Sequence, residues 1–125
     1  MQIKPMMISL FVSLAACGPN LNLEGLGTEM SQTEIGAEIV GNLITFTGRN
    51  STNYTMTLKE DGVINVSRPR DSGVWFFSEG TSDICLRFAL YASGDTGCFG
   101  IAKLPEANKY VTDHGFLIEI LRRQQ

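Results

Sequence analysis

The sequence is poor in charge and lacks an apolar run long enough to cross a membrane permanently as a helix. Charged residues make up 18% of the 125 residues, and the formal net charge is -3. A protein that binds nucleic acid normally presents a basic surface to the phosphates, so we expect no nucleic-acid partner. Hydrophobic residues make up 43% of the chain. This composition is typical of one small folded domain and not of a disordered chain.

The chain is also poor in histidine and lacks common catalytic motifs. His114 is the only histidine, and its neighbour Asp113 should point to the opposite face of a strand, so we expect no catalytic dyad. One histidine is too few for a closed zinc site, and no glycine-rich phosphate loop or nucleophile elbow is present. The acidic residues that could form a catalytic pair fall in predicted turns, where carboxylates are usually solvated: Glu60, Asp61, Asp71, Glu79 and Asp83. We therefore predict no enzyme, no metal and no cofactor; a hydrolase would need a cleft where His114 meets carboxylates.

The pattern at the N-terminus predicts a targeting signal. Residues 6–16 are almost entirely apolar and follow Lys4, and such a run is shorter than the roughly 20 residues of a membrane-spanning helix. It has the length of the apolar region of a secretory signal. The run ends in Leu14-Ala15-Ala16-Cys17, which resembles the lipobox of bacterial prolipoproteins. The alternative is an ordinary signal peptide followed by a cysteine that occurs there by chance.

The resemblance to prolipoproteins implies a location and a domain plan. It implies cleavage before Cys17, acylation of that cysteine and stable anchoring by several acyl chains. Gly18, where an aspartate would imply retention at the inner membrane, points to the outer membrane facing the periplasm. We expect a signal peptide over residues 1–16, a lipidated cysteine and flexible tether over 17–30, and one β-rich domain over 31–125. The chain is similar in this plan to small, uncharacterised envelope lipoproteins with a β-meander domain.

The remainder of the chain predicts one short helix followed by a β-meander. Ser31 and Glu34 have the spacing of a capping box, and Gly41 is placed to end a helix over residues 32–40. From Leu43 onward apolar and polar residues alternate, with turn residues every eight to twelve positions, as in Asp61-Gly62. We expect a mainly β fold: a small antiparallel meander or barrel of seven or eight strands.

Removing Cys17 from the count leaves Cys85 and Cys98 as a pair. In an oxidising periplasm an even pair predicts one disulfide. A regular hairpin would pair Cys98 with about Ala89, which places the thiols too far apart. The bridge therefore requires residues 90–96 to leave regular strand pairing as a wider loop.

Two groups of residues could contact a partner or ligand. Arg68 and Arg70 lie close together in a predicted loop and could bind carboxylates or phosphates. Trp75 stands in an aromatic stretch that either fills the core or lines a pocket. Our first hypothesis is a binding or interaction module for an envelope protein, similar in plan to periplasmic inhibitors of lysozyme or proteases. The alternative is a carrier of a small apolar ligand, with a cavity lined by residues such as Tyr54, Met56, Trp75, Phe88 and Phe99.

Overall fold

The fold is a single curled antiparallel sheet with one α-helix. The computed structural model describes residues 22–48 and 51–123, so the predicted lipobox, which ends at Cys17, lies outside the described residues. The strands are β1 (Thr28–Glu29), β2 (Leu43–Thr47), β3 (Asn53–Leu58), β4 (Val63–Arg68), β5 (Arg70–Phe77), β6 (Ile84–Phe88), β7 (Thr96–Phe99), β8 (Ile101–Lys103), β9 (Lys109–Thr112) and β10 (Leu117–Arg122). The prediction of a mainly β domain with one short helix is confirmed. The expected seven or eight strands are too few, because the sheet has 10.

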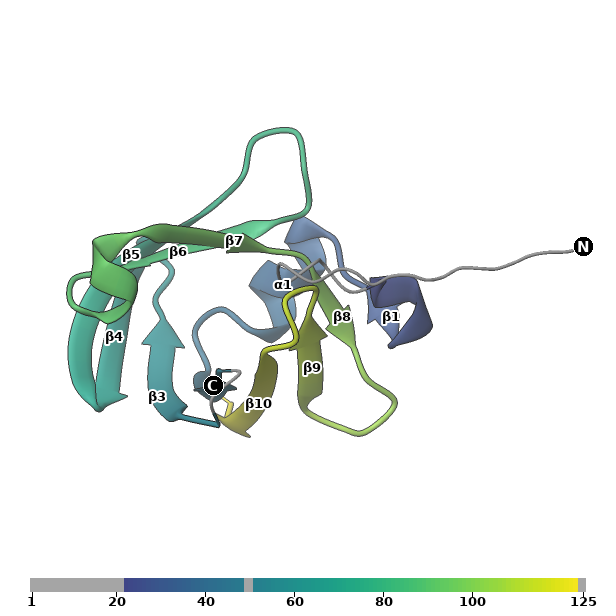
Figure 1. Cartoon of the computed structure of the whole chain (residues 1–125). Helices are drawn as coiled ribbons and strands as arrows, with labels where there is room; N and C mark the ends of the chain where they lie inside the picture. The colour runs from purple at the N-terminus through teal and green to yellow at the C-terminus, as the bar shows by residue number, and fades with distance from the viewer. Residues whose placement is uncertain (1–21, 49–50, 124–125) are drawn as a thin grey trace, which may run out of the picture.

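The sheet is made of two meanders joined through the first long strand and the last one. Its strand order is β1-β8-β9-β10-β2-β3-β4-β5-β6-β7. β10 lies antiparallel to β2, with Ile118 opposite Phe46 and Ile120 opposite Ile44. This long-range pairing lets the sheet curl into a half-barrel around a common interior (Figure 1).

One expected strand is divided at Gly100. β7 pairs with β6, whereas β8 pairs with β9 and β1. The Gly100 N–H donates to Oδ1 of Asp113 (3.2 Å), and its carbonyl accepts from the Asp113 N–H (3.0 Å). A β-carbon at Gly100 would lie 2.9 Å from a methyl group of Leu23. The bend at this glycine, together with the two-residue strand β1, accounts for the higher strand number.

The helix α1 (Gln32–Glu38) closes the interior of the curled sheet. The predicted capping box is present: the Ser31 hydroxyl accepts from the Glu34 N–H, and the Glu34 carboxylate accepts from the Ser31 N–H. The helix ends two positions before the predicted residue 40. Ile35 of the helix and Ile39, which caps its C-terminus, are buried in the main core.

Polar contacts hold α1 at both ends. The Gln32 amide donates to carbonyls of the β5–β6 loop, at Ser78 (3.3 Å) and Thr81 (2.5 Å). At the other end the Glu38 carboxylate lies 3.0 Å from the Lys103 ammonium and accepts from the Tyr110 hydroxyl. The hydrogen bond from Lys103 holds the pKa of Glu38 below its ordinary value, although burial opposes this. The helix therefore bridges two distant parts of the sheet.

Residues 22–30, which the composition assigned to the tether, instead pack on the sheet. Leu23 belongs to a 3-10 helix, η2 (Leu23–Gly25), and is buried against Ala102 and Val111 on the outer face of β8 and β9. Met30 is buried in the main core, and its N–H donates to the carbonyl of Ile101 (2.9 Å). Both apolar side chains pack against the sheet. The local sequence does not indicate this packing, because the residues that they contact are distant in the sequence.

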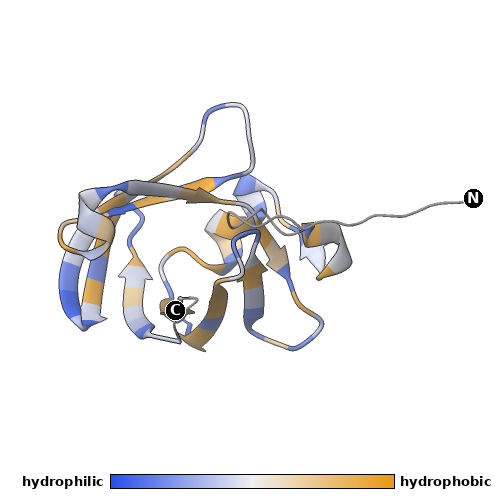
Figure 2. Ribbon diagram, in the orientation of Figure 1, coloured by the Kyte–Doolittle hydropathy of each residue, from blue (hydrophilic) through white to orange (hydrophobic). Residues whose placement is uncertain are grey.

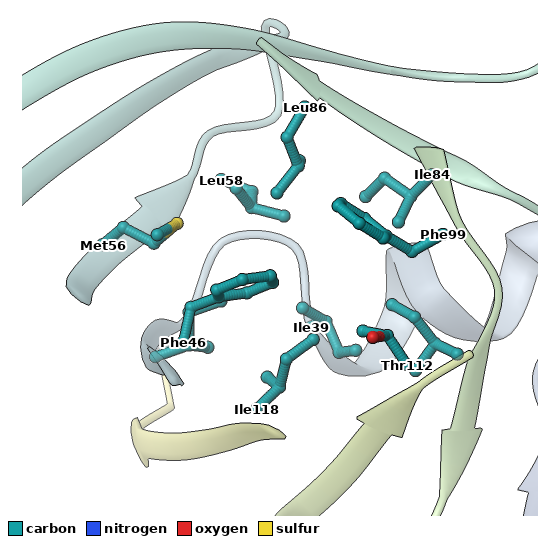
Figure 3. A pocket seen from close by; sticks show the side chains of 11 residues that line it. Ile39, Phe46, Met56, Leu58, Ile84, Leu86, Phe99, Thr112 and Ile118 are labelled. Carbon is teal, nitrogen blue, oxygen red and sulfur yellow. The ribbon is translucent and has the colours of Figure 1, made fainter. Parts of the chain in front are cut away.

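Side chains fill the interior. Hydrophobic and hydrophilic residues alternate along strands such as β4 (Figure 2), whose buried residues are Ile64 and Val66. A small apolar cavity of about 10 Å³ lies among core side chains that include Ile39, Phe46 and Phe99 (Figure 3). This volume is at the lower limit for one water molecule.

Candidate functional site

The disulfide fixes the end of the sheet that carries the candidate site. Cys85 of β6 lies directly opposite Cys98 of β7, with their Cα atoms 4.0 Å apart, and the two are bonded. Between the strands the chain forms a 3-10 segment, η3 (Tyr91–Gly94), in place of a regular hairpin. The predicted disulfide is confirmed, and the chain leaves regular strand pairing over residues 89–95, one residue short of the predicted end because Thr96 pairs with Arg87.

The predicted contact residues lie on different faces of the sheet. Arg68 and Arg70 do not lie in a loop: they end β4 and begin β5, and only Pro69 separates the two strands. Arg70 lies opposite Ser67 and faces outward, whereas Trp75 faces the core. The Trp75 indole donates to the carbonyl of Lys59 (2.7 Å). The structure therefore does not bring Trp75 together with the arginines.

An open hollow of about 760 Å³ lies beside Arg70. β4 and β5 form one wall, and the chain that follows β6 forms the other. Its lining residues are Asn65, Val66, Ser67, Arg70, Asp71, Ser72, Ala89 and Leu90. The hollow combines a cation, hydroxyl groups and an exposed leucine.

Asp71 joins the two walls of this hollow. It was expected to be solvated in a turn, but it lies in β5 and is buried. Its carboxylate accepts hydrogen bonds from the N–H groups of Ser72 (2.7 Å), Leu90 (3.1 Å) and Tyr91 (3.1 Å). Burial raises the pKa of Asp71, but these three donors outweigh it and hold the pKa below the ordinary value of 3.8. The charged carboxylate at neutral pH therefore ties the loop to β5.

The loop that Asp71 holds has an unusual backbone and displays an exposed leucine. Ala92 and Ser93 have φ angles of 54° and 55°, followed by Gly94 at 76°. This left-handed region is costly for residues with a β-carbon and persists only where neighbouring contacts impose it. In the sequence Leu90 continues the alternation of Leu86 and Phe88, but β6 ends at Phe88 and Leu90 is 71% exposed.

Aromatic contacts complete the support of the loop. The Tyr91 ring packs against Tyr54 and Phe88, with centroid distances of 4.7 and 5.5 Å. Its hydroxyl donates to the carbonyl of Pro69. Burial, followed by the charges of Asp71 and Tyr54, raises the pKa of Tyr91. Leu90 is therefore presented by a loop whose base is fixed by packing and by hydrogen bonds.

The histidine lies in a different part of the fold. The prediction that Asp113 and His114 point apart is wrong, because both lie in the turn after β9 and their side chains meet at 2.9 Å (Nδ1 to Oδ1). Asp113 also holds the bend at Gly100, and the His114 ring packs edge-on against Phe99. Within the residues that the structure describes, no three His, Cys, Asp or Glu side chains gather as a metal site.

The interior offers little room for a ligand. Ligand pockets usually enclose 300 to 1,000 Å³, far more than the cavity of about 10 Å³. Of the lining residues expected for a carrier, Met56 and Phe99 border this cavity. Tyr54, Trp75 and Phe88 are partly buried and pack against the core instead. This filled interior favours binding at the surface.

The fold and the site together define a small half-barrel whose disulfide-linked strands present a braced loop beside a hollow. Across residues 22–48 and 51–123, no helix is long and apolar enough to span a membrane. No known protein family, curated protein or solved structure matches the chain.

Proposed function

We propose that the protein is an outer-membrane-anchored periplasmic lipoprotein that binds another envelope protein through its braced loop, residues 89–95, and the adjoining hollow. The observation that carries this proposal is the presentation of Leu90. A leucine that is 71% exposed stands on a loop whose base is held by Asp71 and by the Tyr91 ring. A loop whose backbone is already held in place loses little conformational entropy on binding, so an apolar side chain that it displays can be buried by a partner at a low entropic cost.

The position of the proposed anchor agrees with this role. The described chain begins near β1, whereas the β4–β5 hairpin lies on the far side of the domain (Figure 1). In the sheet order, β4 and β5 are also several strands from β1. A domain held at its N-terminal end would present the hollow and loop away from the membrane, where a periplasmic protein can reach them.

The anchor is tested by replacing Cys17 with alanine. We expect Cys17→Ala to lose incorporation of labelled palmitate and to move from the membrane fraction to the soluble fraction, because the acyl chains supply the membrane affinity. Gly18→Asp serves as the matched variant: it should keep the label and move to the inner membrane. A Cys17→Ala protein that stayed in the membrane fraction would refute the lipid anchor.

The binding role is tested by site-specific photo-crosslinking in cells that make the full chain. A photoreactive phenylalanine analogue in place of Leu90 should give a protein adduct. The same analogue in place of Leu117, a 51% exposed leucine on β10, should give none, because that strand is remote from the loop. Adduct masses are read by gel and mass spectrometry. Equal adducts at both positions, or none at Leu90, would contradict the proposal.

A further inference from the structure

The outer face of β4 to β7 continues from the hollow and carries no acidic side chain. The strand register places alternate residues of these strands on this face, starting at Val63, Arg70, Cys85 and Thr96, although Cys85 itself is buried. The chain as a whole has 13 acidic residues and a net charge of -3. The acidic residues of this half of the sheet are confined to the turns and to buried Asp71. The face therefore differs in charge from the molecule that carries it.

Apolar side chains form a strip across this face. Val63 and Val74 are direct cross-strand neighbours and are 40% and 38% exposed. Phe76, which is 47% exposed, lies opposite Cys85, and Cys85 in turn lies opposite Cys98. Exposed apolar side chains scattered singly are ordinary, but a contiguous group of them marks an interaction surface. The exposed part of the strip is therefore Val63, Val74 and Phe76, and the disulfide beside Phe76 joins β6 to β7.

Two arginines border the strip without a partner in the described residues. Arg87 lies opposite Val74, and Arg70 lies at the start of β5. Neither takes part in an ion pair or a side-chain hydrogen bond within residues 22–48 and 51–123. On the other side of the sheet, Lys103 and Lys109 pair with glutamates at 3.0 and 3.7 Å. Both guanidinium groups on this face are therefore available to a partner, as are those of Arg68 and Arg122 among the described residues.

We infer that the outer face of β4 to β7 binds an acidic segment of the partner protein, with an apolar side chain of that segment on Val74 and Phe76 and carboxylates on Arg70 and Arg87. Val74 is level with Arg87 and four residues from Arg70 along β5. Four residues of extended chain span about 13 Å. Two acidic residues four positions apart in an extended partner segment would therefore match the spacing of the two arginines. Guanidinium groups bind carboxylates bidentately, and aromatic and arginine side chains are enriched at interfaces.

A protein segment is favoured over a lipid surface by the position of the face. The inference rests on the proposed function, in which the N-terminal end is held at the membrane. β4 and β5 lie on the side of the domain away from β1 (Figure 1). Anionic headgroups at the anchoring membrane would then lie on the wrong side of the domain for Arg70 and Arg87.

The test places the photoreactive analogue at Phe76 in the full-length chain and maps the adduct by mass spectrometry. We expect an adduct with the same protein that reacts at Leu90, at a segment with two acidic residues flanking apolar ones. That segment, made as a labelled peptide, is then titrated by fluorescence anisotropy. Arg70→Glu with Arg87→Glu should weaken binding about tenfold or more, through lost attraction and added repulsion. Arg122→Glu, an exposed arginine of β10, is the matched control and should leave binding unchanged.

Each other outcome has a defined meaning. An adduct at Leu90 but none at Phe76 would overturn this inference and leave the binding role in place. Adducts at neither position would overturn both. An adduct at Phe76 with lipid, with a second copy of the chain or with a segment that has no acidic residues would reject the acidic-segment partner. Equal weakening by the Arg122 control would show nonspecific attraction and would also reject it.

Discussion

Replacing Ile35 with alanine should lower the free energy of unfolding by about 2–5 kcal/mol, the usual cost of removing a large aliphatic side chain from a core. Ile35 is fully buried, at 0% exposure, on a helix of 7 residues. A helix this short is marginal alone and depends on its packed face. The loss should therefore include part of the contacts that α1 makes at both ends of the half-barrel. Urea unfolding followed by the fluorescence of the single tryptophan, Trp75, measures the change.

The same helix offers a control. Thr33 is exposed on α1, and Thr33→Ala keeps the capping box intact. Its effect on stability should stay within about 0.5 kcal/mol, as for most surface substitutions. An Ile35→Ala protein as stable as the Thr33→Ala protein would show that α1 does not stabilise the sheet.

Removing the disulfide should cost about 3 kcal/mol. The bridged residues Cys85 and Cys98 are 13 positions apart in sequence, and closing a loop of that size in the unfolded chain accounts for this amount in the chain-entropy description. Fewer neighbours support β7 than support an inner strand, because it ends the sheet order and pairs with β6. The Cys85→Ser, Cys98→Ser double variant is compared with the parent by urea unfolding, both in the Cys17→Ala background.

A chemical control separates the bond from the side chains. The parent protein unfolded in the presence of dithiothreitol should follow the curve of the double variant. If reduction left the midpoint unchanged while the double variant lost stability, the loss would come from the serine substitutions and not from the bond.

Local patterns in the sequence predicted the elements of the fold better than their arrangement. The capping box at Ser31 and Glu34 and the alternation after Leu43 depend on neighbouring residues, and both are present in the structure. The partner of β2 on its second edge is β10, and no local pattern specifies such a distant pairing. The division at Gly100 depends on Asp113 and Leu23, which are also distant in sequence.

The candidate site was predicted only in part for the same reason. Arg70 lies in the hollow, but the turn at Pro69 is tighter than the predicted loop, and strand alternation then directs Trp75 inward. The sequence predicted Asp71 to be a solvated acidic residue in a turn. Two of the N–H groups that donate to its carboxylate belong to a loop about 20 positions later, which no local pattern indicates. Leu90 continued an apolar alternation, and the early end of β6 could not be read from that alternation.

The pairing of β2 with β10 also determines when the domain can complete its fold as the chain is synthesised. β2 can pair with β3 as soon as both have emerged, but its other edge has no strand until residues 117–122 arrive. Contacts between distant parts of a chain form slowly because a long loop must first be closed. The domain therefore completes its sheet only when its last strand is available, and a chain that stops before Leu117 leaves an open edge in the middle of the sheet.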